Sequence, residues 1–168
     1  MANMIPISTV TVGSGGASSI DFVNIPQIYT DLIIKLSARR DATSTSVDIT
    51  FNGSASGYSR IRILGNGATA SSASATSQTF IEDPMSVQSD WTSNTFGNVE
   101  IYIPNYTSSN NKSISIDSAT ENNATTAYAV LVAGLWANTS PISSIKIVPA
   151  SGSFTQYSSA TLYGIRKY

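Results

Sequence analysis

The sequence contains no histidine and no cysteine, and only 11% of its 168 residues are charged. Histidine is the usual proton shuttle near neutral pH, and histidine and cysteine are the usual ligands of catalytic transition metals. These absences argue against a hydrolase, a redox enzyme or a zinc protein. We therefore expect no enzymatic activity, no catalytic residue, no metal site and no cofactor, and a chain that binds a partner or builds a structure.

The balance of charge and hydropathy excludes further classes of partner. Nine basic and ten acidic residues leave a net charge of −1, so there is no broad basic surface for nucleic acid or an anionic membrane. No apolar run approaches the ~20 residues that a membrane span needs. The first residues, from Met1 to Pro6, lack the basic and apolar parts of a secretory signal. The length suits one domain over residues 1–168.

Apolar and polar residues alternate through most of the chain, and helical periodicity hardly occurs. Leu32, Ile34 and Leu36, for example, fall on one face of a strand and mark that face as the core side. Similar short segments are separated by Gly, Pro, Asn and Ser. They lie at residues 5–12, 20–22, 32–39, 46–51, 58–64, 99–103, 114–116, 127–136, 142–147 and 160–165. The pattern predicts an all-β, antiparallel β-sandwich of about 8–10 strands.

Three segments carry additional expectations. Residues 1–17 are expected to form an N-terminal strand or arm that ends in a glycine-rich turn. Residues 65–77 are a run of Gly, Ala, Ser and Thr that can bury little apolar area, so we expect a surface loop there. Residues 127–136 are apolar on both faces of a strand. Such a strand is central in its sheet, or one of its faces lies in an interface.

Four of the nine basic residues lie in two short segments, Arg39 with Arg40 and Arg60 with Arg62. If the two segments are adjacent in the sheet, they form a basic patch that could dock on an acidic protein surface. The alternative is a set of rim residues paired with neighbouring aspartates, since exposed ion pairs contribute little on their own.

Aromatic residues gather in the middle and later parts of the chain. The candidates for a surface or interface role are Trp91, Tyr102, Tyr106, Tyr128 and Trp136. Tyrosine and tryptophan on a strand surface or a loop tip either stack on sugars or anchor protein interfaces. Tyr102 is expected to point away from the core, because it alternates with apolar neighbours. Trp136 follows an apolar strand and is expected in the core.

The carboxylates show no arrangement that indicates chemistry. Two pairs flank turns and are interpreted as solvated turn residues rather than as a glycosidase pair, Asp21 with Asp31 and Asp83 with Asp90. Asp117 and residues 121–123 are rich in the oxygen ligands that calcium accepts. Their spacing matches no EF-hand, and turn chemistry explains Asp and Asn in a loop more simply.

Several short segments occur together in an order typical of one group of proteins. Residues 22–32 fit the pattern F-x-N-I-P-x-x-Y-x-D-L, and residues 51–53 with 58–59 fit a later Phe-Asn…Tyr-Ser element. Residues 103–106 read Ile-Pro-Asn-Tyr. The closing segments are 135–136, 142–145 and 160–165. From residue 18 onward the chain thus resembles small virion proteins of tailed bacteriophages.

The resemblance implies a jelly-roll sandwich, often a homotrimer, with no catalytic residue among the matching elements. It implies either a capsid decoration (cement) protein or a domain of a tail or head fibre. We expect the first: a protein on the capsid surface that contacts the major capsid protein, docks through the four arginines and stabilises the shell. The alternative is a receptor-binding module whose exposed Trp or Tyr stack on host glycans. A cleft lined by Trp91, Tyr102 or Tyr106 would favour the glycan, and burial of these rings in a subunit contact would favour decoration.

Overall fold

A computed structural model describes residues 3–43, 46–82, 84, 86–123 and 126–166. Within these residues the chain forms eleven strands and no helix. No helix that could cross a membrane is therefore found in the part of the chain that the structure describes. The all-β antiparallel sandwich expected from the alternation is confirmed, with eleven strands in place of about 8–10.

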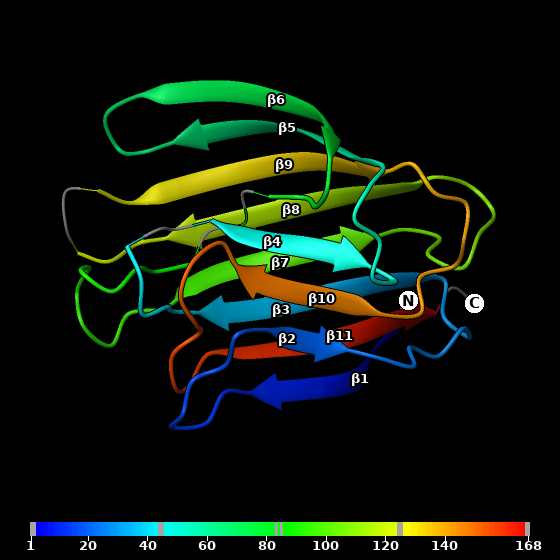
Figure 1. The fold of residues 1–168 in the computed structure, drawn as a ribbon, viewed down its shortest axis with the longest axis horizontal. Helices are drawn as coiled ribbons and strands as arrows, with labels where there is room; N and C mark the ends of the chain where they lie inside the picture. The colour runs from blue at the N-terminus through cyan, green and yellow to red at the C-terminus, as the bar shows by residue number, and fades with distance from the viewer. Residues whose placement is uncertain (1–2, 44–45, 83, 85, 124–125, 167–168) are drawn as a thin grey trace.

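The strands form a large and a small antiparallel sheet. The small sheet has the order β2-β10-β4, and the large sheet has the order β1-β11-β3-β7-β8-β9-β5-β6. The strands of the small sheet are β2 (Ile20–Phe22), β10 (Ile145–Pro149) and β4 (Val47–Phe51). The strands of the large sheet are β1 (Asn3–Thr11), β11 (Ser159–Arg166), β3 (Asp31–Ala38), β7 (Gly97–Ile103), β8 (Lys112–Thr120), β9 (Tyr128–Trp136), β5 (Tyr58–Gly65) and β6 (Ala70–Gln78). In Figure 1 the small sheet lies in front of the large one, and β6 and β1 are the two edges of the large sheet.

The connections identify the sandwich as a jelly roll with two inserted hairpins. Without the hairpins β5–β6 and β8–β9, one layer has the order β1-β11-β3-β7 and the other the order β2-β10-β4. Ile81 adds a short segment beside β4, where its backbone N–H and C=O bond those of Ile49 at 3.0 and 2.8 Å. The segment at Ile81 stays in the same layer as β4, and at every other remaining connection the chain crosses from one layer to the other, as in two interlocked Greek keys. The inserted strands β8, β9, β5 and β6 widen only the large sheet, and we call them the sheet extension.

Side-chain alternation places the core between the layers. On β3 the side chains of Leu32, Ile34 and Leu36 are buried, and on the facing small sheet those of Ile49 and Phe51 are fully buried. Every second residue of each of these strands therefore contributes to one apolar core. The core side that the sequence assigned to β3 is confirmed.

The segment of Gly, Ala, Ser and Thr is a strand over most of its length, so the surface loop expected at residues 65–77 is wrong. Residues 70–78 form β6, which pairs with β5 along its length. A turn begins at Asn66, whose side-chain oxygen accepts hydrogen bonds from the backbone N–H groups of Ala68 (3.1 Å) and Thr69 (2.8 Å). The turn and the backbone ladder hold the strand, and its side chains are all exposed or half-buried. The N-terminal segment behaves as expected, since β1 covers most of it and a turn follows.

Candidate docking surface

On strand β5 the charged side chains face inward and the isoleucines face outward, which is the reverse of the usual arrangement. Arg60 and Arg62 point to the inner side of the sheet, where Tyr58 and Leu64 at the two ends of the strand are buried. Ile61 and Ile63 then face outward, with 54% and 61% of their surface exposed. A shift of one residue would reverse every side chain of the strand, so the burial of Tyr58 and Leu64 fixes this register. The strand therefore leaves two large apolar side chains facing solvent.

The neighbouring strand β9 places further apolar side chains beside these isoleucines. Leu131 lies directly opposite Ile63, and Ala133 lies opposite Ile61. Leu131 is 57% exposed and Leu135 is 37% exposed. We call Ile61, Ile63, Leu131, Ala133 and Leu135 the outer apolar patch; four of its five residues line one shallow hollow. β9 lies between β8 and β5 in the sheet, so it is a central strand. One of its faces is buried, and its other apolar face is exposed.

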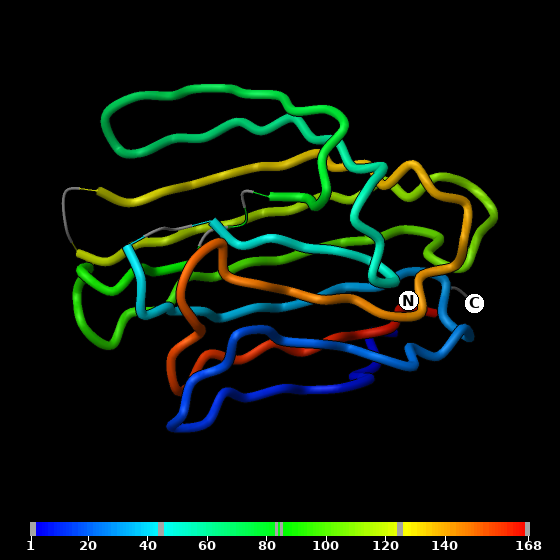
Figure 2. Tube along the Cα trace, in the orientation of Figure 1, coloured from blue at the N-terminus to red at the C-terminus, as the bar shows by residue number. Residues whose placement is uncertain are grey.

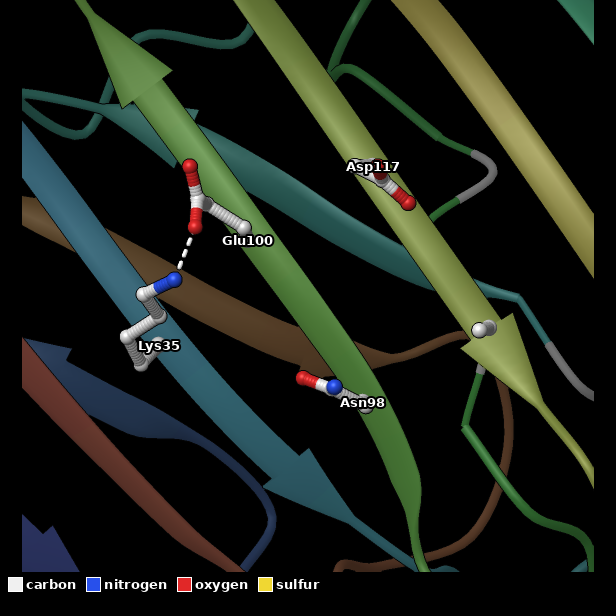
Figure 3. A pocket seen from close by; sticks show the side chains of 5 residues that line it. Lys35, Asn98, Glu100 and Asp117 are labelled. Atoms are coloured by element: carbon white, nitrogen blue, oxygen red, sulfur yellow. Dashed lines mark hydrogen bonds and ion pairs between the residues drawn. The ribbon is translucent and has the colours of Figure 1, made fainter.

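A polar row continues from the patch toward the centre of the sheet. Asp117 on β8 lies opposite Leu131, Glu100 on β7 lies opposite Asp117, and Lys35 on β3 lies opposite Glu100. Figure 3 shows Lys35 paired with Glu100, with Asp117 on the far side of Glu100. The side chains of Lys35 and Glu100 are 48% and 41% exposed, so their ion pair contributes little to stability. These residues and Asn98 line a second hollow, which contains no aromatic ring.

The four arginines do not gather into one patch. Arg39 and Arg40 follow β3, whereas Arg60 and Arg62 lie on β5, and three strands separate β3 from β5 in the sheet. The condition for a shared basic patch is therefore not met.

Arg39 and Arg40 bind the protein's own backbone. The Arg39 guanidinium donates to the carbonyl oxygens of Ser89 (3.1 Å), Trp91 (3.0 Å) and Thr92 (2.8 Å), and so holds the loop before β7. Arg40 is fully buried and donates to the Ser86 hydroxyl at 3.0 Å. Burial lowers the pKa of Arg40 to about 10, while Asp48 and Asp41 act in the opposite direction.

Arg60 and Arg62 face the interior side of the sheet extension. Arg60 pairs with Glu82, and only 7% of its side chain is exposed. Arg62 is half-buried between Ala73 and Val132, its partners on the two neighbouring strands. Arg40 and Arg60 are thus withdrawn from solvent, and Arg39 and Arg62 are only partly exposed. We do not retain the arginines as a docking site.

The candidate aromatic residues divide between the core and the rim. Trp136 is 1% exposed and stacks on Tyr58 with ring centroids 6.1 Å apart, so its expected place in the core is confirmed. Tyr106 is also fully buried, and its hydroxyl donates to the Pro26 carbonyl. Trp91 stacks on Tyr128 at 5.7 Å, and each is half-buried.

Tyr102 lies on the outer face, as expected, and is half-buried there. Its hydroxyl donates to the Asp31 carboxylate at 3.0 Å, and burial together with this carboxylate raises the pKa of Tyr102. Four surface hollows lie along the large sheet, and none of these four is lined by Trp91, Tyr102 or Tyr106. None of these four hollows is therefore the aromatic cleft that would favour a glycan.

Asp31 and the residues of the oxygen-rich loop take structural positions. Asp31 is buried and also accepts a hydrogen bond from the backbone N–H of Asn105 at 2.9 Å. In the oxygen-rich loop, Glu121 accepts from the N–H of Asn123 (2.7 Å) and Asn122 donates to the Thr126 carbonyl (2.7 Å), as turn residues do. Asp83 lies outside the described residues. Among the residues that are described, no three His, Cys, Asp or Glu side chains are grouped as metal ligands would be.

No protein-family model matches the chain, and no curated protein matches it.

Proposed function

We propose that this chain is a structural protein of a bacteriophage virion, which docks on the capsid surface through the outer apolar patch and stabilises the shell. The observation that carries the proposal is the reversed polarity of β5, which leaves Ile61 and Ile63 outside beside Leu131 and Leu135. An exposed apolar patch bounded by polar residues is typical of a protein–protein contact. The order of the virion-like segments in the sequence supports the phage assignment.

The patch is a better docking site than the arginines for a physical reason. Its side chains are open to solvent, and each apolar side chain that becomes fully buried contributes roughly 1.5–3 kcal/mol. Arg39 and Arg40 would first have to break their hydrogen bonds to backbone or hydroxyl groups. The trimer implied by the resemblance stays a proposal. The patch indicates a contact with another protein surface, but it does not specify how many copies of the chain assemble.

Binding to empty capsids of the phage that encodes the chain tests this proposal. The double variant Ile63→Gln/Leu131→Gln should bind at least tenfold more weakly, because about 1.4 kcal/mol corresponds to tenfold in affinity. The matched control is Val23→Gln/Ile28→Gln, which replaces two apolar residues that are 67% and 62% exposed outside the patch. The control should bind as the wild type does, and wild-type protein should raise the temperature at which the capsid opens.

Two results would contradict the proposal. Unchanged binding of Ile63→Gln/Leu131→Gln would remove the patch as the docking site. Failure to bind capsids, combined with binding to host cells or to a glycan array, would favour the receptor-binding function instead.

A further inference from the structure

Among the residues that the structure describes, no strand pairs with the outer edge of β6. In the large sheet its one neighbour is β5, so alternate backbone N–H and C=O groups of the regularly paired residues 70–75 point away from the protein. Figure 2 shows β6 as the outermost segment at this end of the sheet. Natural proteins usually protect such an edge with charge, proline or a bulge, because it can pair with another chain.

The opposite edge of the same sheet is protected in this way. The edge strand β1 contains Pro6, which lacks an N–H, and its register shifts between Pro6 and Ser8. In contrast, no residue from Gly65 to Ile81 is charged, and none is proline. The register of β6 shifts only near its end, after residues 70–75 have paired regularly with β5. One edge of the sheet is therefore closed to pairing and the other is open.

β6 also contributes no residue to the apolar core. None of its side chains is buried, and most are serine or alanine, of which alanine has a low preference for strands. The strand depends on the β5 ladder and on the turn at Asn66. A second neighbouring strand would supply the hydrogen bonds that its free edge lacks.

From these features we infer that β6 pairs antiparallel with β6 of a second copy of this chain, about a two-fold axis perpendicular to the sheet. This contact between copies goes beyond the proposed docking on a capsid.

The strand is suited to pair with itself. It is uncharged, so two copies meet without repulsion, and its small side chains crowd neither face. The six residues of its regular part, 70–75, would form about six hydrogen bonds between chains in antiparallel pairing, within the range of about 10 ± 5 in a typical protein interface. A symmetric contact of this kind uses the same surface on both copies.

The pairing also has a consequence for the outer apolar patch. Two eight-stranded sheets become one continuous sheet, and the two-fold axis leaves both outer faces on the same side. The two patches then lie on one surface, with only the two β6 strands between the two β5 strands. A pair of copies would thus present both patches to one partner surface. Since a two-fold contact joins chains in pairs, it is separate from any three-fold contact.

Single cysteines test the pairing directly, because the chain has none of its own. Each residue from Ser71 to Ala75 is replaced by cysteine in turn, and disulfide-linked dimers are measured under mild oxidation. A disulfide needs Cα atoms about 4.4–6.8 Å apart, so cross-linking should peak at one or two adjacent positions beside the axis and fall on both sides. Ser8→Cys on the β1 edge is the control and should cross-link only at the slow rate of random collision.

A second measurement uses charge rather than cross-linking. The wild-type protein should sediment as an even multiple of the 17.7 kDa chain, whereas Ser72→Lys/Ser74→Lys should shift toward the single chain without loss of strand content by circular dichroism. Ser8→Lys should leave the mass unchanged.

The inference is overturned if no β6 cysteine cross-links faster than Ser8→Cys. It is also overturned if wild type sediments as a single chain or as three chains without a peak in the β6 series. Cross-linking and sedimentation are measured without capsids, so a failure of pairing is distinguishable from a failure of docking. Ser72 and Ser74 lie opposite Ile63 and Ile61, so the Lys variant is used for pairing alone.

Discussion

Ile34 shows at the scale of one residue how sharply the two sides of β3 differ. Its side chain is fully buried, whereas Ser37 on the same strand is exposed on the opposite side. Ile34→Asp should lower the free energy of unfolding by more than ~3 kcal/mol, because an unpaired carboxylate would be placed in the core. Chemical denaturation of this variant and of Ser37→Asp, which should change by less than ~0.5 kcal/mol, checks the prediction. Melting of Ile34→Asp within a few degrees of wild type would contradict the assigned face.

Single residues also mark what the sequence could not show. The burial of Ile34 follows from local alternation, which is visible in the sequence. The burial of Arg40 does not, because the oxygen atoms that accept its hydrogen bonds come from Ser46, Ser86 and Ser151, far apart along the chain. Only the folded chain brings them together around the guanidinium. The charge was therefore predictable, and its place inside the protein was not.

At the scale of elements, side-chain alternation predicted the strands whose side chains pack in the core. It missed β6, whose side chains do not. The two apolar faces of residues 127–136 indicated a central strand or an interface, and β9 is central with one face open. Residues 70–78 have no apolar alternation to read, since β6 buries no side chain. The signal that was available is Asn66-Gly67, a turn dipeptide that favours a hairpin between two strands.

The direction of the side chains on β5 was equally hidden. Arg60 and Arg62 alternate with Ile61 and Ile63, and the sequence alone would place the isoleucines inside. Tyr58 is instead held in the core, where its hydroxyl accepts a hydrogen bond from the backbone N–H of Phe51 at 2.8 Å. The burial of Tyr58 decides which alternate residues of β5 face inward. It therefore leaves Ile61 and Ile63 on the outer face, in the outer apolar patch.

The turn at Asn66 gives a prediction at this scale. Asn66→Ala removes the side-chain oxygen that accepts from two backbone N–H groups, so the amides of residues 70–75 should exchange with solvent at least about tenfold faster. The melting temperature should hardly change, because β6 buries no side chain. Hydrogen exchange at a concentration where the protein is a single chain measures this, with Asn98→Ala as the control. Unchanged protection of β6 would mean that the β5 ladder alone holds the strand.

At the scale of the whole molecule, the fold separates a closed core from an open outer surface. The jelly-roll strands and the small sheet enclose the buried residues, while the sheet extension adds a patch and an edge that face outward. The patch would serve docking and the edge would serve pairing, so each can be altered by substitutions that leave the core intact. Because docking would use exposed apolar residues, its dependence on salt distinguishes apolar contacts from contacts between charges.

Docking through the outer apolar patch should resist salt. The Debye length falls from about 10 Å at 0.1 M to about 3 Å at 1 M ionic strength, which weakens contacts between exposed charges and leaves apolar burial intact. Capsid binding by wild type should therefore change by less than about twofold between 0.1 M and 1 M sodium chloride, measured by co-sedimentation. The Ile63→Gln/Leu131→Gln variant should remain weaker at both concentrations, because its loss is apolar contact. A tenfold or greater loss of wild-type binding at 1 M would instead indicate docking through charged residues, and the outer apolar patch would no longer account for the contact.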